Sequence, residues 1–236
     1  DATKIPLREK AVKKEKVKKV KRKAGRPKKG EAREAIKPKI LEQQKEMQTV
    51  EEMLCLVSTE CGVGIKQNSK GNKEVWIGGK LHISAVDGDI PIIAFYSGAN
   101  VHDSSVSLPL IQETSKRVNY LYDLQDAGYD ADIIREFSTA LGHRPIIDIN
   151  PKNSKELKVK IEVQKDEQKK FEMLSLVQSS DTHHYNQRSM VERVNKYLKE
   201  DFGCNTIYYQ GATKVASVLA FGILSVCIHQ SLKLVT

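Results

Sequence analysis

Alternating apolar and polar positions predict the strands of this chain. The clearest apolar region spans Glu74–Gly98 and is divided by the turn Asp87-Gly88-Asp89, which predicts a β-hairpin. Residues 118–122 and 145–149 form two shorter apolar runs of strand length, and residues 1–6 resemble the end of another strand. The sequence therefore predicts strands distributed along the chain rather than grouped in one region.

Apolar residues with helical spacing predict the elements between these strands. Thr49 with Glu52 forms a capping box, and Asp103 and Asp130 are placed to cap two helices. The Gly-, Asn- and Lys-rich stretch 62–73 is typical of a loop. Because helices alternate with strands, we expect an α/β fold with a mostly buried mixed sheet. The helical stretches are residues 40–57, 106–117, 131–141, 185–199 and 212–234, and the highly charged residues 152–170 are either a surface helix or a connector.

Positive charge is concentrated at the start of the chain. The 236 residues carry a net charge of +9, but residues 1–30 contain 14 basic and 3 acidic side chains. The remaining residues hold 25 basic and 27 acidic side chains and are close to neutral. Residues 10–30 contain too little apolar surface to fold alone, so we expect a partly disordered basic arm that binds a polyanion.

A short motif inside this arm resembles an AT-hook. Gly25, Arg26 and Pro27 are followed by Lys28 and Lys29. In an AT-hook the extended Arg-Pro unit lies in the narrow minor groove of A·T-rich DNA, where the potential is most negative. A solvated basic linker is an equally good interpretation of a single motif of this kind.

Cysteine usage and hydropathy favour a reduced, cytoplasmic location without a membrane span. The four cysteines match no zinc-binding spacing and are too few for a disulfide scaffold. The longest apolar run, residues 215–228, is shorter than a bilayer requires and is more typical of a buried core helix. The chain opens without a methionine, so we interpret it as part of a longer protein.

The stretch 185–199 carries the strongest candidate chemistry. Tyr185, Arg188, Glu192 and Lys199 lie along one face of the predicted helix, with spacings of three, four and seven residues. An aromatic ring, two cations and a carboxylate together suit a phosphate backbone held beside a metal ion. A plain amphipathic helix with one Arg188–Glu192 ion pair explains the same spacing. The neighbouring apolar stripe is formed by Met190, Val191, Val194 and Leu198.

Carboxylates near the ends of strands supply the other candidate metal ligands. Asp126 follows the run at 118–122, and its neighbours Asp123 and Asp130 are alternatives on sequence alone. Magnesium prefers oxygen ligands and keeps open positions for phosphate oxygens, and two such ions support an in-line displacement at phosphorus. A metal site could therefore form if such an acid and Glu192 converge in the fold.

The chain as a whole resembles the DDE transposases of bacterial insertion sequences. The Tyr-x2-Arg-x3-Glu-x6-Lys spacing matches their motif, and further similarities follow in the same order along nearly the whole chain. These similarities are Asp1-Ala-Thr, Lys80-Leu-His, Ala99-Asn-Val-His-Asp-Ser, Leu121-Tyr-Asp-Leu-Gln-Asp-Ala-Gly-Tyr-Asp, Gly142-His-Arg-Pro-Ile-Ile-Asp-Ile-Asn-Pro and Phe221-Gly-Ile-Leu.

The resemblance implies a ribonuclease H-like fold: a mixed sheet flanked by helices, with a basic insertion after the first strand. Residues 1–6 would end the first catalytic strand, 7–73 would form the arm and a helical insertion, and 74–236 the catalytic core. The implied catalytic and metal-binding triad is Asp1, Asp126 and Glu192, with Mg²⁺ as cofactor and Mn²⁺ as a substitute. Tyr185, Arg188 and Lys199 would contact the transposon end.

This resemblance also implies the partners and leaves two alternatives. Double-stranded DNA would be the substrate, bound by a homodimer in the bacterial cytoplasm at the nucleoid. Because strand residues upstream of Asp1 would be missing, we expect residues 1–236 alone to be inactive or nearly so. The alternatives are a catalytically inactive DNA-binding protein, decayed or reused, and a structure-selective nuclease that needs no terminal repeats.

Overall fold

The computed structural model describes residues 2–12, 38–67, 70–151, 154–175 and 180–235. Asp1 and the AT-hook-like residues Gly25–Lys29 lie outside these ranges, so their predicted roles are not located in the fold.

A four-stranded antiparallel sheet is built around the long strand β3. β1 pairs with residues 78–82 on one edge of β3, while β2 and then β4 follow each other along the opposite edge. β3 bends at Gly78, where φ is +151° and a Cβ atom would lie 2.1 Å from the Ile5 carbonyl oxygen. Only glycine permits this close approach of two backbones. The strands are β1 (Ala2–Pro6), β2 (Gly62–Gln67), β3 (Lys73–Val86) and β4 (Ile90–Gly98).

A second, two-stranded sheet holds β5 (Tyr122–Gln125) and β6 (Arg144–Ile147) in parallel. The short 3₁₀ helix η2 (Ala127–Tyr129) and the helix α4 (Asp132–Ala140) connect them. The prediction of a mixed α/β fold is confirmed, but the described strands form two sheets rather than one continuous sheet.

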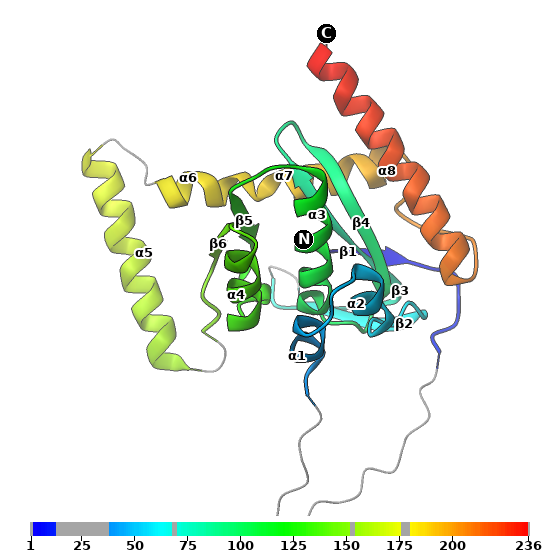
Figure 1. The fold of residues 1–236 in the computed structure, drawn as a ribbon, viewed down its shortest axis with the longest axis horizontal. Helices are drawn as coiled ribbons and strands as arrows, with labels where there is room; N and C mark the ends of the chain where they lie inside the picture. Colours follow the sequence, from blue (N-terminus) through cyan, green and yellow to red (C-terminus); the bar gives the residue numbers. More distant parts are fainter. Residues whose placement is uncertain (1, 13–37, 68–69, 152–153, 176–179, 236) are drawn as a thin grey trace, which may run out of the picture.

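Helices cover both faces of the larger sheet (Figure 1). Alternate residues of β4 divide between the faces: Ala94 and Tyr96 pack toward α7 and α8, and Ile93 and Phe95 toward α3. This period of two is the normal side-chain alternation of a strand. On the α3 side lie α1 (Ile40–Lys45), α2 (Val50–Cys55), η1 (Asp103–Val106) and α3 (Ser107–Arg117).

The C-terminal half of the chain is mainly helical. The charged stretch predicted as a surface helix or a connector contains the helix α5, which buries none of its described residues. The last helix, predicted over 212–234, is α8 and packs along β4. The elements are α5 (Lys155–Ser175), α6 (Ser180–Gln187), α7 (Ser189–Lys196), the π-helical turn η3 (Tyr197–Asp201) and α8 (Ala212–Val235).

Three local predictions are wrong. Residues 62–67 form the strand β2 rather than a loop, because they pair with residues 73–78 of β3 in a hairpin. Asp103 does not cap its helix: the side chain of His102 accepts the hydrogen bond from the Ser104 backbone N–H, and Asp103 binds Lys80 instead. Asp130 likewise caps no helix.

The helix α8 buries only one of its faces. Among the described residues it is the one helix long and apolar enough to cross a membrane, although a soluble core helix passes the same test. Val215, Leu219 and Val226 are buried against the sheet, which confirms the prediction of a core helix for that face. The opposite face exposes large apolar side chains at Phe221, Leu224, Ile228, Leu232 and Val235.

Candidate nucleic-acid and metal site

Asp126 is positioned by the end of β5. Its Oδ1 accepts a 2.8 Å hydrogen bond from the Gly128 backbone N–H, which starts the turn η2 and fixes the carboxylate. The two alternative acids are committed elsewhere. Asp123 is buried and accepts a hydrogen bond from the Ser138 hydroxyl, and Asp130 accepts hydrogen bonds from Arg135 and from the Asn150 backbone. Asp126 is therefore the best-placed ligand of the three.

A second carboxylate, which the sequence reasoning missed, lies close to Asp126. Asp148 follows β6, and the ends of parallel neighbouring strands lie side by side. The pKa of the Tyr185 phenol is raised by its partial burial first, and both Asp148 and Asp126 raise it further. Asp148 also forms a 3.2 Å ion pair with Lys165 of α5. The signal that could have identified Asp148 is its position near the end of the strand predicted at 145–149.

The helix face predicted from the sequence is partly confirmed. The Arg188 guanidinium lies 5.7 Å from the centre of the Tyr185 ring, and its Nη2 is 3.3 Å from Glu192 Oε1. Glu192 is well exposed, with 59% of its side chain accessible, whereas Arg188 is largely covered. The structure therefore links these three side chains in one row and leaves the carboxylate accessible.

The helix itself is interrupted at Arg188. A single turn residue separates α6 from α7, and the backbone N–H groups of Arg188 and Val191 bond three residues back rather than four. The π-helical turn η3 then ends the segment before Phe202 and Gly203, where the sequence predicted its end. Interruptions of this type recur at functional sites in helices.

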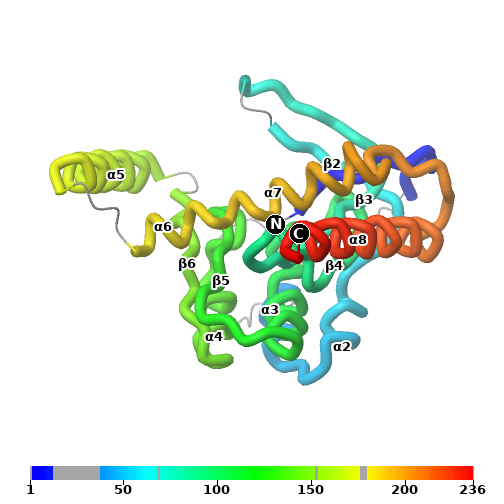
Figure 2. The backbone as a smooth tube through the Cα atoms, turned by 90° about the horizontal axis from the view of Figure 1, so that it is seen from above, coloured from blue at the N-terminus to red at the C-terminus, as the bar shows by residue number. Residues whose placement is uncertain are grey.

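The same helical segment spans both sheets (Figure 2). α6 contacts β5, where His184 stacks on Tyr122 with ring centres 4.1 Å apart. α7 contacts β3 and β4. Val194 of α7 and Leu198 of the following turn η3 are fully buried, as the predicted apolar stripe requires. This arrangement carries Arg188 and Glu192 across the junction between the two sheets.

A groove of about 590 Å³ lies at that junction. Residues 83–87 of β3 and its turn line one side, residues 118–125 line the other, and Arg188 lies along the helix side. Within the described ranges, no three His, Cys, Asp or Glu side chains converge closely enough to hold a metal ion. Asp126 and Glu192 lie on separate elements, and Asp1 is outside the described residues.

Lys199 occupies a different part of the surface from Glu192. Its side chain is partly buried, and its pKa is lowered by that burial and by the nearby charges of Lys4 and Lys66. Glu74 has the opposite effect on the same ammonium group. The structure thus places Lys199 beside the strands β1, β2 and β3 and not beside the carboxylate on α7.

An α/β domain with a carboxylate at a strand end, and with an aromatic ring, a guanidinium and a second carboxylate in one helix row, suits a metal-dependent enzyme that acts on nucleic acid. The comparison with protein families agrees with this class: the family model described as Transposase DDE domain matches residues 1–228. The chain therefore belongs to the transposase DDE domain family, whose members are enzymes of DNA transposition and recombination. No curated protein and no solved structure matched the chain.

Proposed function

We propose that this chain is the catalytic domain of a transposase with a ribonuclease H-like core. It would cleave DNA strands at insertion-sequence ends and transfer the resulting 3′-hydroxyl to target DNA. The observation that supports this most is the family match over residues 1–228. The row Tyr185–Arg188–Glu192 beside the strand end at Asp126 is consistent with the proposal.

Asp126 and Glu192, with Asp1, would hold one or two Mg²⁺ ions, with Mn²⁺ as a substitute. The donor set fits this group, because Asp126 is oriented but not buried and Glu192 is exposed. When bound, the metal would activate the attacking oxygen and stabilise the leaving oxygen. Asp148, close to Tyr185 and Asp126, is a further carboxylate able to support such a site.

The chain's own side chains would bind and orient the DNA. Arg188 presents a planar guanidinium suited to a phosphate, and Tyr185 stacks against it and offers a ring to a base. Lys199 would add a phosphate contact farther along, and Gly25–Lys29 with the rest of the arm would add salt-sensitive, nonspecific affinity. We also propose a homodimer on DNA and a cytoplasmic, nucleoid-associated location.

The alternative is a decayed or reused DNA-binding protein. Two observations favour it: Glu192 already has an ion-pair partner in Arg188, and no three described His, Cys, Asp or Glu side chains come close enough to hold a metal ion. In that case DNA binding would persist through the cationic residues without any role for the acids.

Metal-dependent plasmid nicking separates the two proposals. Supercoiled plasmid carrying the element's ends would be incubated with Mg²⁺ or Mn²⁺ and with the full-length protein. We expect cutting that depends on the metal ion.

In the full-length protein, Glu192→Gln should abolish cutting while DNA binding is retained. Glu200→Gln is the matched control, because Glu200 is an exposed helical carboxylate paired with Lys196 four residues before it. Equal cutting by wild type and Glu192→Gln would rule out a DDE mechanism. Cutting that does not depend on the terminal repeats would instead indicate a structure-selective nuclease.

A further inference from the structure

We propose that Lys4, Lys66 and Lys199 together form a second phosphate-binding site, which holds the backbone of duplex DNA beside the β2–β3 hairpin. The three residues come from β1, β2 and η3 and are far apart in the sequence. The inference rests on the proposed function only in taking DNA as the polyanion.

Two of these lysines lie around one carboxylate. Lys4 forms an ion pair with Glu74 of β3, and Lys66 is the direct partner of Glu74 in the β2–β3 ladder. Directly opposed residues of an antiparallel pair have neighbouring side chains. The hairpin therefore brings Lys4 and Lys66 to the same carboxylate, although 62 positions separate them.

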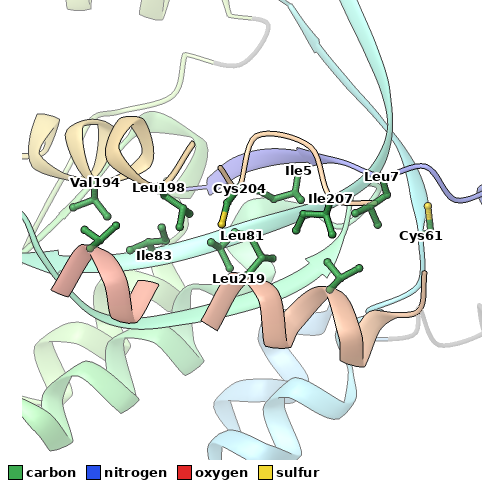
Figure 3. Close-up of a cluster of buried hydrophobic side chains, with 12 residues drawn as sticks. Ile5, Leu7, Cys61, Leu81, Ile83, Val194, Leu198, Cys204, Ile207 and Leu219 are labelled. Atoms are coloured by element: carbon green, nitrogen blue, oxygen red, sulfur yellow. The ribbon is translucent and has the colours of Figure 1, made fainter. Parts of the chain in front are cut away.

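The third lysine is brought there by the core. Leu198 is fully buried and belongs to the same apolar cluster as Ile5 of β1 (Figure 3). Lys199 follows Leu198 directly, so its backbone leaves the core next to β1. Because the Lys199 side chain is partly buried, its ammonium group is held near the surface of the strands rather than free in solvent.

The pKa directions of Glu74 and Lys199 agree with this grouping of four charges. The pKa of Glu74 is lowered mainly by its hydrogen bond to Lys4, and the charges of Lys4, Lys66 and Lys199 lower it further. The pKa of Lys199 in turn is lowered by burial and by the charges of Lys4 and Lys66, and Glu74 opposes this shift. The cluster therefore has three cations for one carboxylate, and an added phosphate would relieve the repulsion among the cations.

This cluster would extend the proposed DNA path beyond the helix row. Lys199 is seven residues from Glu192, which corresponds to about 10 Å along a helix. Lysine ammonium groups act as point charges and carry no base specificity, so the cluster would bind phosphates irrespective of sequence. The cluster lies on an open surface between a helix and a hairpin. Such a surface suits duplex DNA, whereas a small anion is better held in a closed pocket.

Salt-dependent DNA binding tests the cluster. The protein would be titrated against a fluorescent duplex without metal, in the Glu192→Gln background, so that cleavage plays no part. The double variant Lys4→Gln/Lys66→Gln should reduce the slope of log K against log salt concentration by about 2, because each lost phosphate contact removes about 0.9.

The matched control is Lys45→Gln/Lys116→Gln, which removes the same charge from exposed ion pairs on α1 and α3. It should leave the slope nearly unchanged. The Glu74→Gln variant should bind DNA at least as tightly as the parent protein, because it removes the carboxylate that pairs with Lys4.

An unchanged slope in Lys4→Gln/Lys66→Gln, or an equal loss in the control, would overturn the proposal. So would displacement of DNA by inorganic phosphate beyond the effect of chloride at equal ionic strength, which would indicate a free-anion site. A full-length protein that never cuts DNA would refute the proposed catalysis. If its DNA binding still depended on these lysines, the proposed phosphate-binding site would be retained.

Discussion

At the scale of single residues, burial gives His82 a different protonation behaviour from that of an exposed histidine. His82 is fully buried in β3, and its Nε2 lies 2.8 Å from the Ser97 hydroxyl. Burial lowers the pKa of His82 from 6.5 to about 3, with Asp103 opposing the shift and Lys80 adding to it. His82 is therefore a packing residue of the sheet.

His82 should make the folded state sensitive to acid. The unfolded chain binds a proton at His82 below pH 6.5, whereas the folded state does so only near pH 3. Stability is therefore complete above pH 6.5 and is lost as pH falls through the window between these values. We expect a loss of about 2 kcal/mol between pH 6.5 and 5 from this group.

Urea denaturation at pH 7 and pH 5 measures this loss. His82→Gln should flatten the difference between the two pH values, and His183→Gln, at an exposed position on α6, should not. An identical pH response in wild type and His82→Gln would contradict a neutral buried His82.

At the scale of elements, the buried face of α8 packs unusually closely against its neighbours. Its buried face includes Gly222, where a Cβ atom would lie 2.5 Å from Cys204 Sγ and 2.7 Å from Leu198 Cδ1. Those neighbours are themselves buried and have little room to move. The glycine therefore allows η3 and the following turn to approach α8 closely.

Gly222→Ala should destabilise the protein by about 1–2 kcal/mol. Alanine favours a helix by about 1 kcal/mol over glycine, but the overpacking against Leu198 and Cys204 costs more. Chemical denaturation would measure the change, with Ser217→Ala at an exposed position on the same helix as the control. A Gly222→Ala protein more stable than wild type would show that helix propensity outweighs the close packing.

At the scale of the whole molecule, the junction between the two sheets is the feature that most affects the proposed site. β4 pairs with β3 as far as Val86, but on the opposite edge β1 pairs only with residues 78–82. Residues 84–86 on that edge face the groove, with β5 on its other side. One more strand in line with β1 would pair there and join the two sheets.

Hydrogen exchange tests this arrangement. We expect faster amide exchange at residues 84–86, which in the described part of the chain pair with β4 alone, than at residues 79–82, which pair with both β1 and β4. Amides of the β2–β3 hairpin at 63–66 serve as the internal control. Equal protection of residues 79–82 and 84–86 would contradict an open edge of β3 at the groove.

The sequence by itself determined the order of most elements and the family. The hairpin, the helix ends at glycines and the capping box at Thr49 follow from local chemistry, because turn residues, caps and periodicity act over a few positions. The row of Tyr185, Arg188 and Glu192 follows for the same reason: helical geometry alone fixes neighbours three and four residues apart.

Only the tertiary structure decided which distant residues meet. Asp103 forms an ion pair with Lys80 and does not cap a helix. Asp148 lies near Asp126, and Lys199 lies near Lys4 and Lys66. Strand pairing and core packing fix these contacts, and both act between residues with no fixed spacing in sequence. For that reason local patterns predicted the parts of the site, while the fold determined how those parts are grouped.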